Sequence, residues 1–169
     1  MPFSLTEEFI SVYRMHPLLP DELEVRSVAT GQTRRTHALA ELLVDHVHTR
    51  MAESSMADLL YSFGRAHPGA LTLQNFPAAL RDLARPSGEP IDLATVDVLR
   101  SRERGVPRYN EFRRYFRLAP ARSFADLTDR PEWAAQLERI YSTVDDVDLM
   151  VGLYAERKPR CLLYTSDAA

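Results

Sequence analysis

Residues 8–23 read EFISVYRMHPLLPDEL, a short amphipathic segment that runs into a proline. Side chains three positions apart on a helix share one face, so Tyr13 and His16 are expected to point the same way. Pro17 disfavours helical geometry at His16, and we predict that the helix ends there. The spacing alone favours a tyrosine and a histidine of the hydrophobic core at a helix end, and a functional pair is the alternative.

The rest of the chain also shows helical periodicity almost throughout. Ser4 and Glu7 form a capping box that predicts the start of the first helix. Further helices are expected from near Thr36 to Glu53, from Met56 to near Gly64, from near Asn75, over 91–105 and 107–118, after caps at Ser123 and Asp129, and over 144–156. Residues 18–35 form a connecting stretch with room for a short strand pair. The predicted fold class is all-α, in one domain of ordinary size.

The composition is that of a soluble globular protein, because 45% of the 169 residues are hydrophobic and 27% are charged. The formal charge of -3 gives no reason to expect a nucleic-acid partner. No apolar run approaches the roughly 20 residues of a transmembrane helix, and the first residues lack the features of a signal peptide. The cellular location is therefore open, with the cytoplasm as the default. The single cysteine excludes an internal disulfide bond.

A group of histidines raises the question of a metal site. His37, Asp45, His46 and His48 lie close together in the sequence. Residues two apart do not share a helix face, and the one-turn spacing of two zinc ligands is missing. We therefore interpret this group as a solvated helix face.

Residues 8–23 resemble the proximal-histidine helix of the haem peroxidase–cyclooxygenase superfamily. Residues 91–116, IDLATVDVLRSRERGVPRYNEFRRYF, resemble the second motif of that superfamily, and residues 144–156, VDDVDLMVGLYAE, are a weaker third match. The three motifs cover most of the chain from Thr6 to Glu156, in the order that the superfamily has. The resemblance implies a haem peroxidase-like multi-helix fold. A tyrosine three residues before the histidine, in the form YRMH, is most similar to the fatty acid α-dioxygenases.

The resemblance also implies a cofactor, haem b, and four site residues. His16 would ligate the haem iron on the proximal side, and Asp97 would accept a hydrogen bond from the other ring nitrogen of His16. Arg100 would contact a haem propionate. Tyr13 would pass an electron and a proton to haem that peroxide has oxidised. The tyrosyl radical would then take hydrogen from a fatty acid, and dioxygen would add to the carbon.

Simpler interpretations of two of these residues remain open. Asp97 can be a helix-face carboxylate paired with Arg100 or Arg104, and Arg100 can be a surface arginine. Glu103 and Arg104 replace the Asp-His pair that the superfamily commonly has at this place. We assign these two residues no catalytic role and expect them to form ion pairs that brace the turn after them.

The resemblance finally predicts an incomplete domain, because the superfamily has a distal histidine well upstream of the proximal helix. Residues 1–160 are expected to be the proximal, C-terminal portion of a haem peroxidase or dioxygenase domain, inactive alone. Residues 161–169, CLLYTSDAA, resemble the translation of a sequencing adapter and are excluded from the fold, with a genuine tail as the alternative. The parent protein is expected to be a haem-dependent fatty acid dioxygenase or peroxidase. The alternative function is a non-enzymatic helical domain that keeps the fold without haem.

Overall fold

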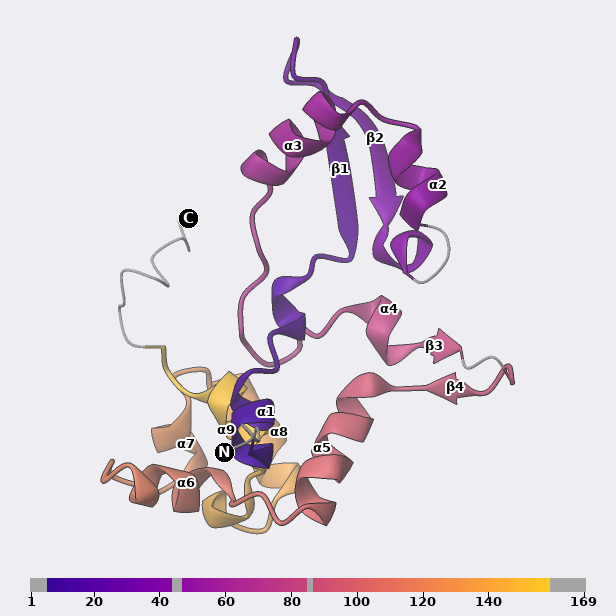
Figure 1. Cartoon of the computed structure of the whole chain (residues 1–169). Coiled ribbons are helices and arrows are strands. Elements are labelled where there is room, and N and C mark those ends of the chain that lie inside the picture. The colour runs from indigo at the N-terminus through magenta and orange to yellow at the C-terminus, as the bar shows by residue number, and fades with distance from the viewer. Residues whose placement is uncertain (1–5, 44–46, 85–86, 159–169) are drawn as a thin grey trace, which may run out of the picture. The chain divides into compact units, whose positions relative to one another are not determined.

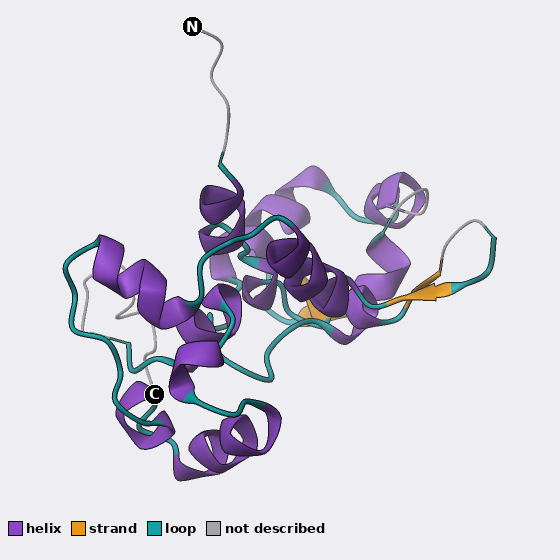
Figure 2. Cartoon of the chain, turned by 90° about the horizontal axis from the view of Figure 1, so that it is seen from below, coloured by secondary structure: helices purple, strands orange, loops and turns teal. Residues whose placement is uncertain are grey.

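A computed structural model describes residues 6–43, 47–84 and 87–158 (Figure 1). The chain divides into two compact units. Unit 1 consists of the chain up to Met15, Ala70–Asn75 and the chain from Ala94 onward, and unit 2 consists of His16–Gly69 and Phe76–Leu93. Helix predominates over strand in the described residues (Figure 2).

Unit 1 is helical and closely packed. Its elements are α1 (Glu7–Val12), α5 (Leu93–Glu103, whose first residue falls in unit 2), α6 (Tyr109–Tyr115), α7 (Phe124–Leu127), α8 (Pro131–Ile140), the 3-10 helix η4 (Val144–Asp146) and α9 (Leu149–Ala155). The buried members of its hydrophobic core are Tyr109, Leu127, Leu137, Val144, Val147, Leu149 and Ala155. Helix α9 passes α6 at Gly152, where an added Cβ would lie 2.3 Å from Tyr109 Cγ. Glycine is needed there because any side chain would overlap the tyrosine ring.

A buried carboxylate joins four helices of unit 1. Asp148, the N-cap residue of α9, is only 3% exposed. Arg102 on α5 donates to it from Nε at 3.0 Å and from Nη2 at 2.6 Å. Tyr141, the C-cap residue of α8, donates at 2.8 Å, and Arg108 before α6 completes the cluster. Burial acts to raise the pKa of Asp148, but the hydrogen bonds from Arg102 and Tyr141 outweigh burial, so this pKa is lowered.

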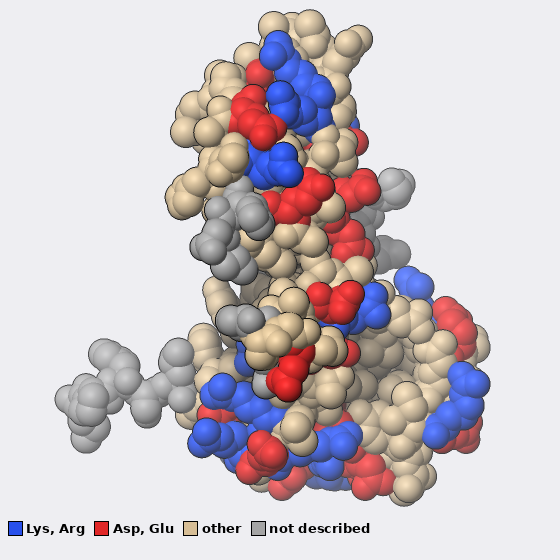
Figure 3. Space-filling view, turned by 90° about the vertical axis from the view of Figure 1, so that its right-hand side faces the viewer, with Lys and Arg blue, Asp and Glu red and all other residues tan. Residues whose placement is uncertain are grey.

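Acidic and basic side chains also pair on the surface of unit 1. Acidic and basic side chains lie side by side in the lower part of Figure 3. One such pair joins Arg114 to Asp145 at 3.0 Å, and Asp145 also accepts a hydrogen bond from buried Asn110 at 2.7 Å. The charges of this unit therefore connect elements of unit 1 to one another.

Unit 2 is built on an antiparallel hairpin of β1 (Glu22–Arg26) and β2 (Thr33–Ala38), with a register irregularity at Val25/Arg26. Helix α3 lies along β1, and α2 lies beside β2 (Figure 1). The bounds of the other elements are η1 (His16–Leu18), η2 (Leu39–Leu42), α2 (Val47–Ala52), α3 (Met56–Arg65), α4 (Ala78–Arg81), β3 (Leu83–Ala84) and β4 (Pro90–Ile91).

Helix α3 covers the free edge of β1 with polar side chains. Ser62 Oγ accepts a hydrogen bond from Arg26 N at 2.7 Å, and Asp58 Oδ1 accepts one from Val28 N at 2.8 Å. These bonds satisfy backbone donors that an edge strand would leave open to another chain. The exposed apolar side chains of the same helix are Met56, Leu60 and Phe63. The fully buried residues of α3 are thus polar, and three of its large apolar side chains are exposed, which is unusual for a surface helix.

The all-α prediction is correct only in the predominance of helix, because two short antiparallel sheets occur, β1–β2 and β3–β4. The strand pair expected within residues 18–35 is present, but β2 extends to Ala38. The helix predicted from Thr36 to Glu53 is therefore wrong. Residues 33–38 are extended because they pair with β1, and this pairing overrides the helical spacing of the apolar residues that follow. The short helices η2 and α2 lie in the remainder of that range.

The predicted helix α3 and the predicted pair α5–α6 are confirmed. The cap at Ser123 is also confirmed, since its side chain accepts a hydrogen bond from the first turn of α7. Ser4 lies outside the described residues. The observed N-cap residues are Thr6 for α1, Pro77 rather than Asn75 for α4, and Arg130 rather than Asp129 for α8. None of the described helices is long and apolar enough to cross a lipid bilayer.

The histidine group does not form the solvated helix face that its spacing suggested. His37 lies in β2 and is 5% exposed, whereas His48 is exposed on α2. Asp45 and His46 lie outside the described residues. Within the part of the chain that the structure describes, no three His, Cys, Asp or Glu side chains gather as ligands for a metal ion.

Candidate functional site

Tyr13 is the C-cap residue of α1 in unit 1. Its N–H donates to Phe9 O at 2.9 Å, and its ring stacks on Phe9 at 5.4 Å between centroids. Tyr13 is 62% exposed, and Phe9 and Val12 are each 47% exposed. Helix α1 therefore presents an open apolar surface with a phenol at its end, and we call this surface the α1 face.

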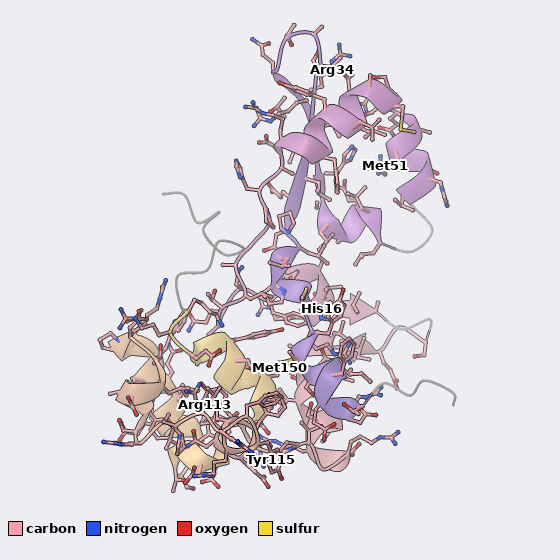
Figure 4. The ribbon with its side chains drawn as sticks, turned by 60° about the vertical axis from the view of Figure 1, so that its left-hand side comes forward. His16, Arg34, Met51, Arg113, Tyr115 and Met150 are labelled. Atoms are coloured by element: carbon pink, nitrogen blue, oxygen red, sulfur yellow. The ribbon has the colours of Figure 1, made fainter. Side chains whose placement is uncertain are left out.

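His16 does not lie on α1. The helix ends at Val12, and His16 opens the 3-10 helix η1 in unit 2. The prediction that the helix would run to His16 is therefore wrong, and the shared-face argument for the pair does not apply. His16 is half-buried, its ring centroid lies 5.2 Å from that of Phe76, and buried Pro17 follows it (Figure 4). Unit 2 thus holds an imidazole in a fixed turn.

Asp97 lies on α5 and is 3% exposed. Its Oδ1 is 2.9 Å from Nη2 of Arg14, the residue after Tyr13. The simpler interpretation of Asp97 as an ion-paired helix carboxylate named Arg100 and Arg104 as partners. The arginine at ion-pair distance is Arg14, just after the end of α1, so this carboxylate ties α5 to the residue that follows Tyr13.

Arg100 forms a two-pronged ion pair with Glu7 in the first turn of α1. Its Nε and Nη2 each donate to a Glu7 carboxylate oxygen at 3.0 Å. These hydrogen bonds lower the pKa of Glu7 and raise the pKa of Arg100. The guanidinium side chain remains 43% exposed, so it can meet a second carboxylate from solvent. Sequence reasoning did not find Glu7 as a partner.

Two hydrogen bonds that the sequence did not predict complete the attachment of α1. Ser11 Oγ lies 3.2 Å from Ser101 Oγ, and Ser101 Oγ donates to the Asp97 carbonyl at 2.9 Å. The hydroxyl of Tyr154 on α9 donates to the carbonyl oxygen of Arg14. The Ser11–Ser101 and Tyr154–Arg14 contacts each join segments far apart in the chain, and no local pattern marks such pairs.

The brace expected from Glu103 and Arg104 is not observed, because both residues are exposed and neither forms an ion pair with a described residue. Their neighbour Arg102 makes the contact instead, through the buried carboxylate of Asp148. The turn between α5 and α6 is therefore braced from its buried side.

The residues present fit a haem group. Haem is flat and largely apolar, carries two carboxylates, and takes one axial protein ligand on its proximal side. Taken separately, unit 1 has the apolar α1 face and the exposed guanidinium of Arg100, and unit 2 has the imidazole of His16, and each of these groups is of a kind that haem requires. A single imidazole suffices for the iron, so a cluster of several ligands is not required.

The comparisons with known proteins give one consistent result. The model of the animal haem peroxidase family matches residues 1–163. The chain is 40% identical to alpha-dioxygenase 1 of Arabidopsis thaliana, over 94% of its own length and 27% of that protein. It is 31% identical to prostaglandin G/H synthase 2 of Gallus gallus, over 92% of the chain and 23% of that protein. A solved variant of the Oryza sativa fatty acid alpha-dioxygenase with palmitic acid matches with a TM-score of 0.84 at 38% identity, over 94% of this chain and 28% of that one.

These relatives are much longer than the matched segment, and the chain spans 27% of the length of the Arabidopsis protein. Both the sequence match and the structural match nevertheless cover 94% of this chain. The predominantly helical fold agrees with the family match over residues 1–163, and the chain belongs to the animal haem peroxidase family.

Proposed function

We propose that residues 1–160 are the proximal portion of a haem-dependent fatty acid dioxygenase that works through a radical on Tyr13. The observation that carries the proposal is the open α1 face. Tyr13 is 62% exposed there, and its hydroxyl makes no hydrogen bond to any described residue. A tyrosine kept for packing alone would bury its ring, because burial of the aromatic surface is what stabilises the fold. The names of the relatives support the choice of substrate.

Three residues would hold the cofactor. His16 would be the axial ligand of haem b, and Asp97 would accept the hydrogen bond from the other ring nitrogen. Arg100 would pair with a propionate, either beside Glu7 or in its place. The bound haem would supply one-electron oxidising equivalents derived from peroxide.

Tyr13 would carry out the step on the substrate. Loss of one electron and the phenolic proton leaves a neutral phenoxyl radical on its ring. The radical oxygen takes a hydrogen atom from a carbon of the fatty acid, which restores the phenol and leaves a carbon radical that combines with dioxygen. The peroxyl radical so formed takes a hydrogen atom back from Tyr13, so the product is a fatty acid hydroperoxide and the tyrosyl radical is regenerated.

The substitution Tyr13→Phe tests this step in the full-length enzyme. It keeps the ring and its stacking on Phe9 and removes only the oxidisable hydroxyl. Oxygen uptake with a long-chain fatty acid should be lost, whereas oxidation of a dye by peroxide should persist. Equal loss of both activities, or of neither, would refute the radical role.

The haem spectrum tests the proximal ligand separately. His16→Ala should remove the shifted Soret band of the full-length protein, because it removes the axial nitrogen. His48→Ala is the matched control, since His48 is an exposed histidine of the same unit. A Soret band unchanged by His16→Ala rules out this ligand. A full-length protein that binds no haem supports the non-enzymatic alternative.

A further inference from the structure

The backbone next to Tyr13 is held by a residue of α9. Tyr154 is 9% exposed, and its hydroxyl donates to the carbonyl oxygen of Arg14, 140 residues earlier in the chain. Arg14 follows Tyr13, the C-cap residue of α1, so this bond holds the main chain directly after the helix. Helices α1 and α9 lie in contact within unit 1 (Figure 1). The bond therefore ties the end of α1 to the best-buried helix of the unit.

The side chain of Arg14 is held as well. Its guanidinium pairs with Asp97 on α5 at 2.9 Å, and the side chain of Asp97 is only 2% exposed. Arg14 is thus fixed through its main chain by α9 and through its side chain by α5. The ring of Tyr13, by contrast, is 62% exposed and stacks on Phe9. The position of the Tyr13 phenol consequently depends on the backbone that Arg14 anchors.

Radical chemistry makes strict demands on that position. Hydrogen transfer requires the reacting atoms to be close and aligned, and a small displacement of a catalytic group costs much of the rate. Burial, with the charge of Asp97 as a further cause, raises the pKa of Tyr154. Its hydroxyl therefore stays protonated and remains a donor at neutral pH.

We infer that Tyr154 is a positioning residue for Tyr13, acting through the Arg14 carbonyl to fix the orientation of the phenol on the α1 face. The inference rests on the proposed function of Tyr13. It concerns a contact between α9 and the end of α1, and it gives Tyr154 no contact with substrate or cofactor.

The variant Tyr154→Phe keeps the buried ring and deletes the donor. Tyr115→Phe is the matched control, because Tyr115 is an exposed tyrosine of the same unit whose hydroxyl donates to Glu111 at 2.8 Å (Figure 4). Two measurements on the full-length protein do not depend on turnover. Hydrogen exchange of the haem-free protein reports the amides from Tyr13 to Met15, and the electron paramagnetic resonance spectrum of the peroxide-treated holoenzyme reports the torsion of the tyrosyl ring.

Tyr154→Phe should speed exchange at these amides, change the hyperfine pattern of the radical, and lower kcat for oxygen uptake about tenfold with KM unchanged. Tyr115→Phe should change none of these quantities. Unchanged exchange and an unchanged radical spectrum in Tyr154→Phe, in an enzyme that Tyr13→Phe inactivates, overturn the inference and leave the proposed function standing. Full oxygenation activity in Tyr13→Phe overturns the proposed function and, with it, the positioning role of Tyr154. Hydrogen exchange then reports only whether Tyr154 holds the main chain at Arg14.

Discussion

A buried aspartate of unit 1, Asp148, and a buried aspartate of unit 2, Asp58, serve different purposes. Asp148 in unit 1 is surrounded by two arginines and a tyrosine from three other elements. Asp58 in unit 2 accepts a backbone N–H from Val28 and lies 3.7 Å from Arg34, which is itself largely exposed. The first carboxylate joins helices from distant parts of the chain, whereas the second protects the edge of one hairpin. Unit 1 should therefore depend on charge for its assembly, and unit 2 on backbone hydrogen bonds.

The units also differ in how much free space surrounds a helical glycine. Gly152 in unit 1 touches the ring of Tyr109, whereas a Cβ at Gly64 of α3 would meet no atom within 4 Å. Interior packing leaves no free volume in the first case, and the second position borders open space. A pair of identical substitutions can therefore measure how tightly each unit is packed.

The largest effect is expected for Gly152→Ala. The new methyl group overlaps Tyr109, so the free energy of unfolding should fall by about 3 kcal/mol or more, measured by urea unfolding followed by circular dichroism. Gly64→Ala, the control, should instead raise it by about 0.5 kcal/mol, because alanine is the better helix former. Similar effects of the two substitutions on the free energy of unfolding would show that the two units do not differ in packing at these glycines.

A smaller effect, and one that depends on pH, is expected for Asp148→Asn. Removal of the charge should cost about 2–4 kcal/mol at pH 7, less than for a fully buried pair because both arginines reach solvent. The folded-state pKa of Asp148 is lowered, so its contribution is present above the unfolded value of about 4 and is lost as pH falls through the folded pKa. The free energy of unfolding of Asp148→Asn should therefore fall less than that of the unsubstituted protein as the pH is lowered.

The exposed Asp129→Asn serves as the control for that titration. It should unfold in acid as the unsubstituted protein does. If both variants retain the same acid transition, Asp148 is not the group that unit 1 depends on.

The smallest effect is expected in unit 2. Ser62→Ala leaves Arg26 N without its acceptor and should cost about 1 kcal/mol, with faster hydrogen exchange at that amide. Phe63→Ser on the same helix should change stability by less than about 0.5 kcal/mol, because Phe63 is 83% exposed. A larger loss for Phe63→Ser would show that the apolar side of α3 contributes to the stability of unit 2.

The features that could be predicted are those that depend on neighbours in sequence. Helices α3, α5 and α6 follow from periodicity and from the glycines near their ends, Gly64 and Gly105. A strand pair was expected within residues 18–35, but the extension of β2 to Ala38 was missed because it comes from pairing with β1. The partner of Asp97 was sought on its own helix, whereas Arg14, which pairs with it at 2.9 Å, lies just after the end of α1. The donation from Tyr154 to Arg14 spans 140 residues, and one sequence carries no signal for such a contact.

The packing of Gly152 against Tyr109 also has a consequence for divergence within the family. A larger residue at Gly152 becomes possible only after the ring of Tyr109 has gone. Loss of that ring removes the hydroxyl that donates to Glu156 at 2.5 Å and accepts from Arg113 at 3.1 Å. Either change alone is harmful, so mutation must replace both residues together or keep both. Homologues should therefore show the two positions varying as a pair, with few intermediates that carry one change without the other.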